Sequence, residues 1–262
     1  MTHPKTRIDK TFETLGRPAL ISFITAGDPD RQTSQEALKA LAENGADIIE
    51  LGMPFTDPMA DGPVIEAASQ RALAAGANMK QTLEMVTTFR RDNQKTPLVL
   101  MGYFNPVMAY GIEKFAADSA KAGVDGLIIV DLPPEESAEL ETALEDKPIN
   151  LIRLLTPTTD EKRLENLLGG AGGFLYYVSI TGITGAASAK AADLKPHIDT
   201  IKNKTDLPVA IGFGVKTPEN AAEMSTVADA VVVGSALVKT LNEEGIPALC
   251  KQVSALASAL KT

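Results

Sequence analysis

The chain has 262 residues, of which 44% are hydrophobic and 23% are charged, a balance typical of a globular protein with a large core. Twenty-five basic and 34 acidic side chains give a formal net charge of −9, which argues against nucleic acid or an anionic membrane surface as the main partner. The single cysteine excludes an internal disulfide and fits a reducing compartment, and we expect a cytoplasmic protein because no signal-peptide pattern or long apolar run is present.

Short apolar runs rich in Ile, Val and Leu recur along the chain, and we predict a β-strand in each of them. Runs that are apolar throughout, rather than alternating, are typical of a parallel sheet covered on both faces. In chain order, the eight predicted strands cover residues 19–25, 47–52, 97–103, 126–132, 150–156, 173–180, 208–214 and 229–235.

Amphipathic patterns between these runs predict helices. Several of the patterns end in Gly or Asn-Gly, which can adopt the left-handed conformation of a helix C-cap. The predicted helices cover residues 34–45, 64–76, 79–92, 112–123, 134–146, 160–170, 194–204 and 218–227, with additional helices at residues 7–16 and 245–260.

The alternation of strands and helices predicts the fold. Eight βα units in one chain favour a single (β/α)8 TIM barrel over residues 1–262, with extra N- and C-terminal helices and an active site at the C-terminal ends of the strands. A doubly wound sheet is the alternative, but it normally has fewer strands and a glycine fingerprint after the first strand, which the segment TAGDPD at residues 25–30 lacks. No linker or low-complexity tract divides the chain, so we expect one catalytic domain.

The segment ELGMPFTDPMADGP, residues 50–63, begins at the end of the second predicted strand and contains three carboxylates and three prolines. Because side chains alternate along a strand, Glu50 shares a face with Ile48. If that face points into the barrel, burial will raise the pKa of Glu50 and poise it for proton transfer. In the alternative arrangement Glu50 points outward and pairs with a lysine of a helix.

Glycines near the end of the chain suggest an anion site. Gly212 and Gly214 end the seventh predicted strand, and Gly234 and Ser235 open a helix, with Ser235 at or near its N-cap. Free N–H groups there could hold a phosphate, which TIM barrels commonly bind in the loops after strands seven and eight. The glycine-rich segment that begins at Ser179 is either a closing lid or an ordinary surface loop.

Several of these segments together resemble a known family. FITAGDP, ELGMPFTDPMADGP, MGYFNP, DLPPEES, YYVSITGITG, GFGV and GSALVK span essentially the whole chain, and with them the sequence resembles the tryptophan synthase alpha subunit family. The resemblance implies a lyase that cleaves indole-3-glycerol phosphate to indole and glyceraldehyde 3-phosphate by a retro-aldol reaction of tryptophan biosynthesis. It also implies no cofactor in this chain, and an α2β2 complex with a beta subunit that carries pyridoxal phosphate.

The resemblance also assigns residues. Glu50 is then the proton shuttle and Asp61 the acceptor of the indole N–H, with Tyr176 beside them; on sequence alone, Asp61 could instead cap the helix that starts near Pro63. The indole pocket is assigned to Phe23, Met101, Tyr103, Ile128, Val130, Leu154 and Tyr176. The phosphate is assigned to Thr184, Gly185, Gly214, Gly234 and Ser235, and the beta-subunit contact to Asp57, Asn105 and Pro133.

The chain departs from the family pattern after Gly185, and Met101 and Val130 are less usual pocket residues. Two other functions stay open at this level. The first is a phosphosugar aldolase with a Schiff-base lysine, against which none of the eight predicted strands contains a lysine. The second is a catalytically silent regulatory subunit that binds a phosphate ligand, against which both carboxylates are intact.

Overall fold

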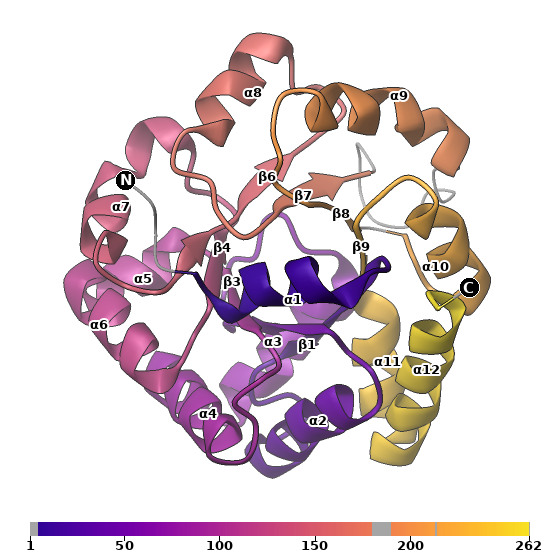
Figure 1. Cartoon of the computed structure of the whole chain (residues 1–262). Coiled ribbons are helices and arrows are strands. Elements are labelled where there is room, and N and C mark those ends of the chain that lie inside the picture. The colour runs from indigo at the N-terminus through magenta and orange to yellow at the C-terminus, as the bar shows by residue number, and fades with distance from the viewer. Residues whose placement is uncertain (1–4, 180–189, 213, 262) are drawn as a thin grey trace.

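A computed structural model describes residues 5–179, 190–212 and 214–261 of the chain. One parallel sheet runs through these residues in the order β5-β4-β3-β2-β1-β9-β8-β7-β6 (Figure 1). Its strands are β1 Ala19–Thr25, β2 Ile48–Gly52, β3 Leu98–Gly102, β4 Gly126–Ile129, β5 Asn150–Leu151, β6 Arg153–Leu155, β7 Leu175–Val178, β8 Val209–Gly212 and β9 Ala230–Val233.

The two outer strands of this order, β5 and β6, are halves of the one strand predicted at residues 150–156. They are separated by Ile152 alone, and Ile152 N–H still donates to the carbonyl of Leu127 at 2.9 Å. The sheet therefore closes on itself through this segment, and the structure is the predicted TIM barrel with one strand interrupted.

Helices surround the barrel (Figure 1). They are α1 Arg7–Leu15, α2 Arg31–Glu43, α3 Pro63–Ala74, α4 Met79–Asp92, α5 Phe104–Tyr110, α6 Ile112–Ala122, η1 Pro134–Glu136, α7 Ala138–Leu144, α8 Glu161–Leu168, α9 Ala191–Lys202, α10 Pro218–Ser225, α11 Ser235–Glu244 and α12 Ile246–Ala259. Helix α5 was not predicted, because seven residues are too few for a helical period to show. No helix in the described parts of the chain is long and apolar enough to cross a membrane.

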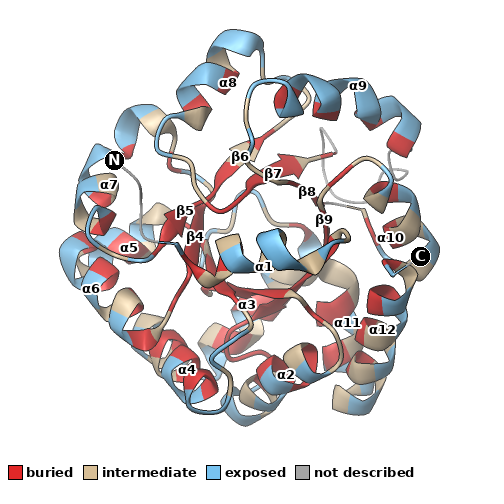
Figure 2. Ribbon diagram, in the orientation of Figure 1, coloured by how far each residue is buried: buried red, intermediate tan, exposed pale blue. Residues whose placement is uncertain are grey.

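Buried side chains form two layers, one inside the barrel and one between the strands and the helices (Figure 2). On β2, Ile48 belongs to the inner layer and Ile49 to the outer one, and both are fully buried. Every residue of β1 and β2 is buried in this way. This double burial is the reason that the strands are mostly apolar instead of alternating between apolar and polar residues.

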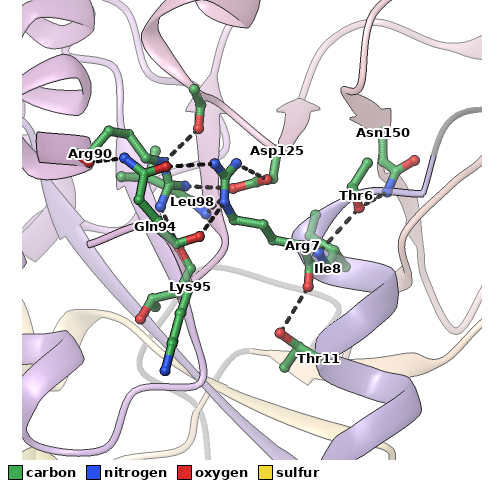
Figure 3. A network of polar contacts seen from close by, with 12 residues as sticks. Thr6, Arg7, Ile8, Thr11, Arg90, Gln94, Lys95, Leu98, Asp125 and Asn150 are labelled. Carbon is green, nitrogen blue, oxygen red and sulfur yellow. Dashed lines mark hydrogen bonds and ion pairs between the residues drawn. The ribbon is translucent and has the colours of Figure 1, made fainter. Parts of the chain in front are cut away.

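Helix α1 lies across the end of the barrel where the strands begin (Figure 1). Ile8 on this helix is fully buried in the inner layer, and Thr6 caps the helix with a capping box. Thr6 also accepts a hydrogen bond from the Asn150 side chain at 2.8 Å (Figure 3). The floor of the barrel is therefore closed, and the opposite end, where the strands finish, remains open for a ligand.

A buried ion-pair network fastens this floor to the outer helices (Figure 3). The Asp125 carboxylate accepts from Arg7 at 2.8 Å, from Arg90 at 2.6 Å and from Leu98 N–H at 2.9 Å. Arg90 also donates to the carbonyls of Gly123 and Thr96. Burial lowers the pKa of Arg90 to about 10, and the Asp125 charge opposes that change, so Arg90 remains positively charged at neutral pH.

Candidate active site

A cavity of about 190 Å³ opens where the strands end. Its wall is mostly apolar, and two carboxylates, Glu50 and Asp61, face into it together with the phenol of Tyr176. Phe23, Met101 and Val232 come from strands or strand ends, Val64 and Ile65 from α3, and Gly214, Gly234 and Ser235 from the last two βα connections.

Glu50 lies on β2, paired with Phe23 of β1 on one side and with Val99 of β3 on the other. It is fully buried, and among the described residues neither carboxylate oxygen has a hydrogen-bond partner. This desolvation raises the pKa of Glu50 to about 8, so the side chain carries a proton at neutral pH. The alternative in which Glu50 points outward to a lysine is therefore wrong.

Asp61 lies in the loop between β2 and α3, and Tyr103 at the end of β3 holds this loop in place. The Tyr103 hydroxyl accepts from Ala60 N–H at 3.0 Å, and it forms a side-chain hydrogen bond with Asp61. Burial raises the pKa of Asp61 to about 6, the Tyr103 bond lowers it, and the charge of Glu66 raises it. Asp61 is therefore largely ionised at neutral pH, whereas Glu50 is neutral.

The role of Asp61 as a helix cap is wrong as well. Helix α3 has Gly62 as its N-cap, without any side-chain hydrogen bond, and Pro63 as its first residue. The carboxylate of Asp61 is therefore left for the cavity. Arg71 of the same helix forms a two-point ion pair with the buried Asp28, at 2.7 and 3.0 Å, which fixes α3 against the loop after β1.

Tyr176 on β7 is 4% exposed and lies near both carboxylates. Burial, followed by the charges of Glu50 and Asp61, raises the pKa of Tyr176 well above its ordinary value, so its hydroxyl stays protonated. Its position depends on Gly212 of the neighbouring strand β8. A β-carbon on Gly212 would lie 2.0 Å from the Tyr176 hydroxyl oxygen, so only glycine leaves room for this ring.

The structure brings together some of the predicted indole-pocket residues but not all of them. Phe23 and Met101 line the main cavity, and Tyr103 and Val130 line a small adjoining cavity that Asp61, Phe23 and Met101 share. Ile128 lies deeper, fully buried in the inner layer. Leu154 packs in the same inner layer and lines a different cavity, beside α8.

The predicted phosphate residues Gly214, Gly234 and Ser235 all line the main cavity. Helix α11 begins at Ser235, and its N-cap Gly234 has no side-chain hydrogen bond. Leu237 N–H donates to the Gly234 carbonyl at 2.8 Å, so among the described residues the N–H groups of Ser235 and Ala236 are the ones left for an anion. Ser235 is thus the first helical residue and not the cap. Thr184, Gly185 and most of the predicted lid, residues 180–189, lie outside the described residues.

Sequence reasoning did not find the α3 wall or the lysine of the cavity. Val64 and Ile65 pack with Phe23 and Met101, and the only sequence signal for them is that α3 follows the Asp61 loop directly. Lys216 lies two residues beyond Gly214 and also lines the cavity. Lys216 follows the seventh predicted strand and does not lie within it, so the strand pattern carries no signal for it.

The residues predicted to meet a beta subunit lie at the surface near this end of the barrel. Asp57 and Asn105 are exposed, and Pro133 is partly buried. The exposed large apolar side chains Met59 and Met108 belong to the same loop and helix as Asp57 and Asn105, at 77% and 50% exposure. In the described part of the chain, no group of three or more His, Cys, Asp or Glu side chains is placed to hold a metal ion.

Comparison with known proteins gives one consistent result. The family model described as tryptophan synthase alpha chain matches residues 10–261. A crystal structure of tryptophan synthase subunit alpha from Legionella pneumophila is 39% identical, with a TM-score of 0.92, and the match covers 98% of this chain and 99% of that one. A structure of Mycobacterium tuberculosis tryptophan synthase is 37% identical, with a TM-score of 0.91, over 99% of this chain and 100% of that one.

Proposed function

Because the chain belongs to the tryptophan synthase alpha chain family, which cleaves indole-3-glycerol phosphate, we propose that residues 1–262 form one catalytic domain whose chemistry is carried by Glu50, Asp61 and Tyr176. The chain is a carbon–carbon lyase of tryptophan biosynthesis. The reaction releases indole and glyceraldehyde 3-phosphate.

Glu50 moves the proton. Cleavage of the bond between indole C3 and the side-chain carbon requires a proton at C3 and the loss of a proton from the adjacent hydroxyl. Glu50, neutral at pH 7, donates its proton to C3. The resulting carboxylate then takes the hydroxyl proton as the carbon–carbon bond breaks, the aldehyde forms and the bonding electrons return to the ring. Glu50 is protonated again at the end of the cycle.

Asp61 stabilises the charge that this protonation creates. A proton on C3 places positive charge toward the ring nitrogen, and an ionised carboxylate that accepts the ring N–H lowers the energy of that state. The pKa of about 6 leaves Asp61 ionised at neutral pH, as this role requires. The two carboxylates therefore divide the work, because complete burial keeps Glu50 neutral while the Tyr103 bond favours the ionised form of Asp61.

The remaining lining residues orient the substrate. Phe23, Met101, Val64 and Ile65 supply an apolar wall suited to the neutral indole ring. Tyr176, kept protonated by burial, presents a hydroxyl donor between the carboxylates and the ring. The free N–H groups of α11, with Gly214 and Gly234, form the phosphate end of the site, to which we also assign Thr184 and Gly185.

Membership of the family implies a beta subunit as partner. We assign the contact to the surface that carries Asp57, Asn105 and Pro133, where the exposed Met59 and Met108 supply apolar area. The proposed assembly is an α2β2 complex in the cytoplasm. No cofactor is assigned to this chain, and pyridoxal phosphate is expected in the beta subunit only.

The observation that carries the residue roles is a fully buried Glu50, without a hydrogen-bond partner among the described residues, facing the same apolar cavity as Asp61. The test is indole release from indole-3-glycerol phosphate, with and without a beta subunit. Glu50→Gln should abolish release and leave substrate binding largely intact, and Asp61→Asn should lose most activity. A Glu50→Gln enzyme that keeps more than about a tenth of the rate, a barrier change of only ~1.4 kcal/mol, would refute the assignment.

Borohydride trapping separates this mechanism from that of a Schiff-base aldolase. Lys216 is the cavity's lysine, and its side chain is exposed, whereas a Schiff-base lysine is usually activated by a desolvated pocket. We expect borohydride with substrate to leave the protein unmodified. A covalent adduct on any lysine would contradict the acid–base mechanism.

A further inference from the structure

Lys216 is the one Lys or Arg side chain among the described residues that line the main cavity. The other charged groups there are the carboxyls of Glu50 and Asp61, and the chain as a whole carries a net charge of −9. A phosphate dianion that enters this cavity is therefore repelled by the ionised Asp61 and by the net negative charge of the protein. The partial positive charge at the start of α11 offsets only part of that repulsion.

The main chain around Lys216 is held in one conformation. Gly214, two residues earlier, has a positive φ of 86°, which favours glycine. Thr217, the next residue, is the N-cap of α10 and accepts a hydrogen bond from Asn220 N–H at 3.3 Å, and Pro218 begins the helix. Lys216 thus lies in a turn between Gly214 and the N-cap of α10, and it lines the same cavity as Gly214 and Ser235.

The ammonium group of Lys216 is also available. Its side chain is exposed, and it forms no ion pair or hydrogen bond with any other described residue. Two other lysines in this part of the sequence differ in this respect, because Lys202 pairs with Asp229 and Lys239 with Glu243. A cation that lines a ligand cavity and lacks a protein partner is placed to pair with a charged ligand.

We propose that Lys216 binds the phosphate of the substrate, as a charged contact that supplements the backbone donors of Gly214, Gly234 and α11. This assignment rests on the proposed function, because it takes the phosphate end of the substrate to lie at those donors. Lys216 then determines selectivity for a phosphorylated substrate over its unphosphorylated counterpart. It contributes to binding and not to the proton transfers, since Glu50 and Asp61 carry those steps.

The test compares Lys216→Gln, Lys216→Arg and the control Lys239→Gln, whose lysine lies on α11 in an exposed ion pair. For Lys216→Gln we expect KM for indole-3-glycerol phosphate to rise about tenfold, equivalent to ~1.4 kcal/mol, with kcat changed less than about twofold. The Kd of glycerol 3-phosphate, measured by calorimetry, should rise by a similar factor. Lys216→Arg should restore both values, and Lys239→Gln should match the wild type.

The outcomes distinguish this proposal from the proposed function. If the wild type releases indole but Lys216→Gln leaves both KM and the Kd of glycerol 3-phosphate unchanged, the Lys216 assignment is overturned and the activity stands. If the wild type releases no indole, the proposed activity is refuted. The calorimetric comparison still decides whether Lys216 binds a phosphate group. A kcat that falls while KM and Kd stay constant would also overturn a binding role.

Discussion

The hydroxyl of Tyr103 is hydrogen-bonded to the carboxylate of Asp61, and it also accepts from the N–H of Ala60 at 3.0 Å. One phenol at the end of β3 thus holds the last part of the loop that precedes α3. The Phe55 ring supports it from the start of the same loop, with ring centroids 5.4 Å apart. The position and the pKa of Asp61 therefore both depend on Tyr103, which follows a different strand, β3.

The pH dependence of the wild-type enzyme follows from the two carboxyls. Asp61 must be ionised to receive the ring N–H, so kcat/KM should rise as pH increases through about 6. Glu50 must hold its proton to deliver it, so kcat/KM should fall as pH increases through about 8. A bell-shaped profile with an optimum near neutrality is expected from steady-state assays across this range. Activity that is still rising above pH 9 would contradict the assignment of Glu50 as the acid.

Tyr103→Phe should move one side of this profile. The lost hydrogen bond lowers the pKa of Asp61 in the wild type, so its removal raises that pKa and shifts the acidic limb of kcat/KM to higher pH. The alkaline limb, which belongs to Glu50, should stay in place. Tyr110→Phe is the matched control, because the Tyr110 hydroxyl bonds to Asp118. A shift of both limbs, or of neither, would show that Tyr103 does not act through Asp61.

Glu50→Gln should make stability less dependent on pH. The folded wild type keeps the Glu50 proton up to about pH 8, whereas the unfolded chain loses it near 4.5. The free energy of unfolding therefore falls as pH rises through this window, and the full cost, a few kcal/mol, is present above pH 8. The Glu50→Gln variant has no proton to lose at this position, so its free energy of unfolding carries no such pH-dependent cost. Its stability relative to wild type should improve between pH 4 and pH 9.

Urea denaturation at these two pH values measures the effect. The exposed Glu139→Gln serves as the control, because Glu139 forms no ion pair with a described residue. A glutamine buried at position 50 can change stability by a constant amount at every pH, so the informative quantity is the difference between the two pH values. An identical effect of Glu50→Gln at pH 4 and pH 9 would mean that the pKa of Glu50 is not raised.

Gly212→Ala should inactivate the enzyme through Tyr176. The added β-carbon would lie 2.0 Å from the phenol oxygen and 2.3 Å from the adjacent ring carbon, so the ring must move away from the carboxylates. We expect at least a tenfold loss of kcat/KM, and overpacking should destabilise the fold by about 1–3 kcal/mol. Gly169→Ala is the control, since its φ of −63° suits alanine. Full activity in Gly212→Ala would show that the position of Tyr176 is unimportant.

Asp125→Ala should destabilise the barrel floor. The substitution leaves the Arg90 guanidinium buried without its carboxylate and removes the acceptor of Leu98 N–H, which together should cost about 3–5 kcal/mol in the free energy of unfolding. Asp199→Ala, which removes an exposed ion pair with Lys195, should cost less than about 1 kcal/mol. Urea denaturation of the two variants checks the contrast. Equal effects would show that the Asp125 network does not stabilise the fold.

The sequence alone predicted the barrel and most of its elements. Strands buried on both faces are apolar at nearly every position, with Glu50 as the exception on β2, and the helices that cover them are amphipathic, so each leaves a local pattern. The position of Glu50 in the C-terminal half of the second predicted strand marked it as a site candidate, and the family resemblance supplied its role. The short helix α5 and the interruption at Ile152 left no periodic signal.

Only the tertiary structure decided which residues meet. Four features depend on strand register and on closure of the barrel. Glu50 faces inward without a hydrogen-bond partner in the described parts of the chain, Tyr103 holds Asp61, Gly212 leaves space for Tyr176, and Lys216 lines the cavity. Local propensity and periodicity describe how each segment folds and which side it buries. They do not encode the contacts between segments distant in the chain, and those contacts set the burial and electrostatics of the site.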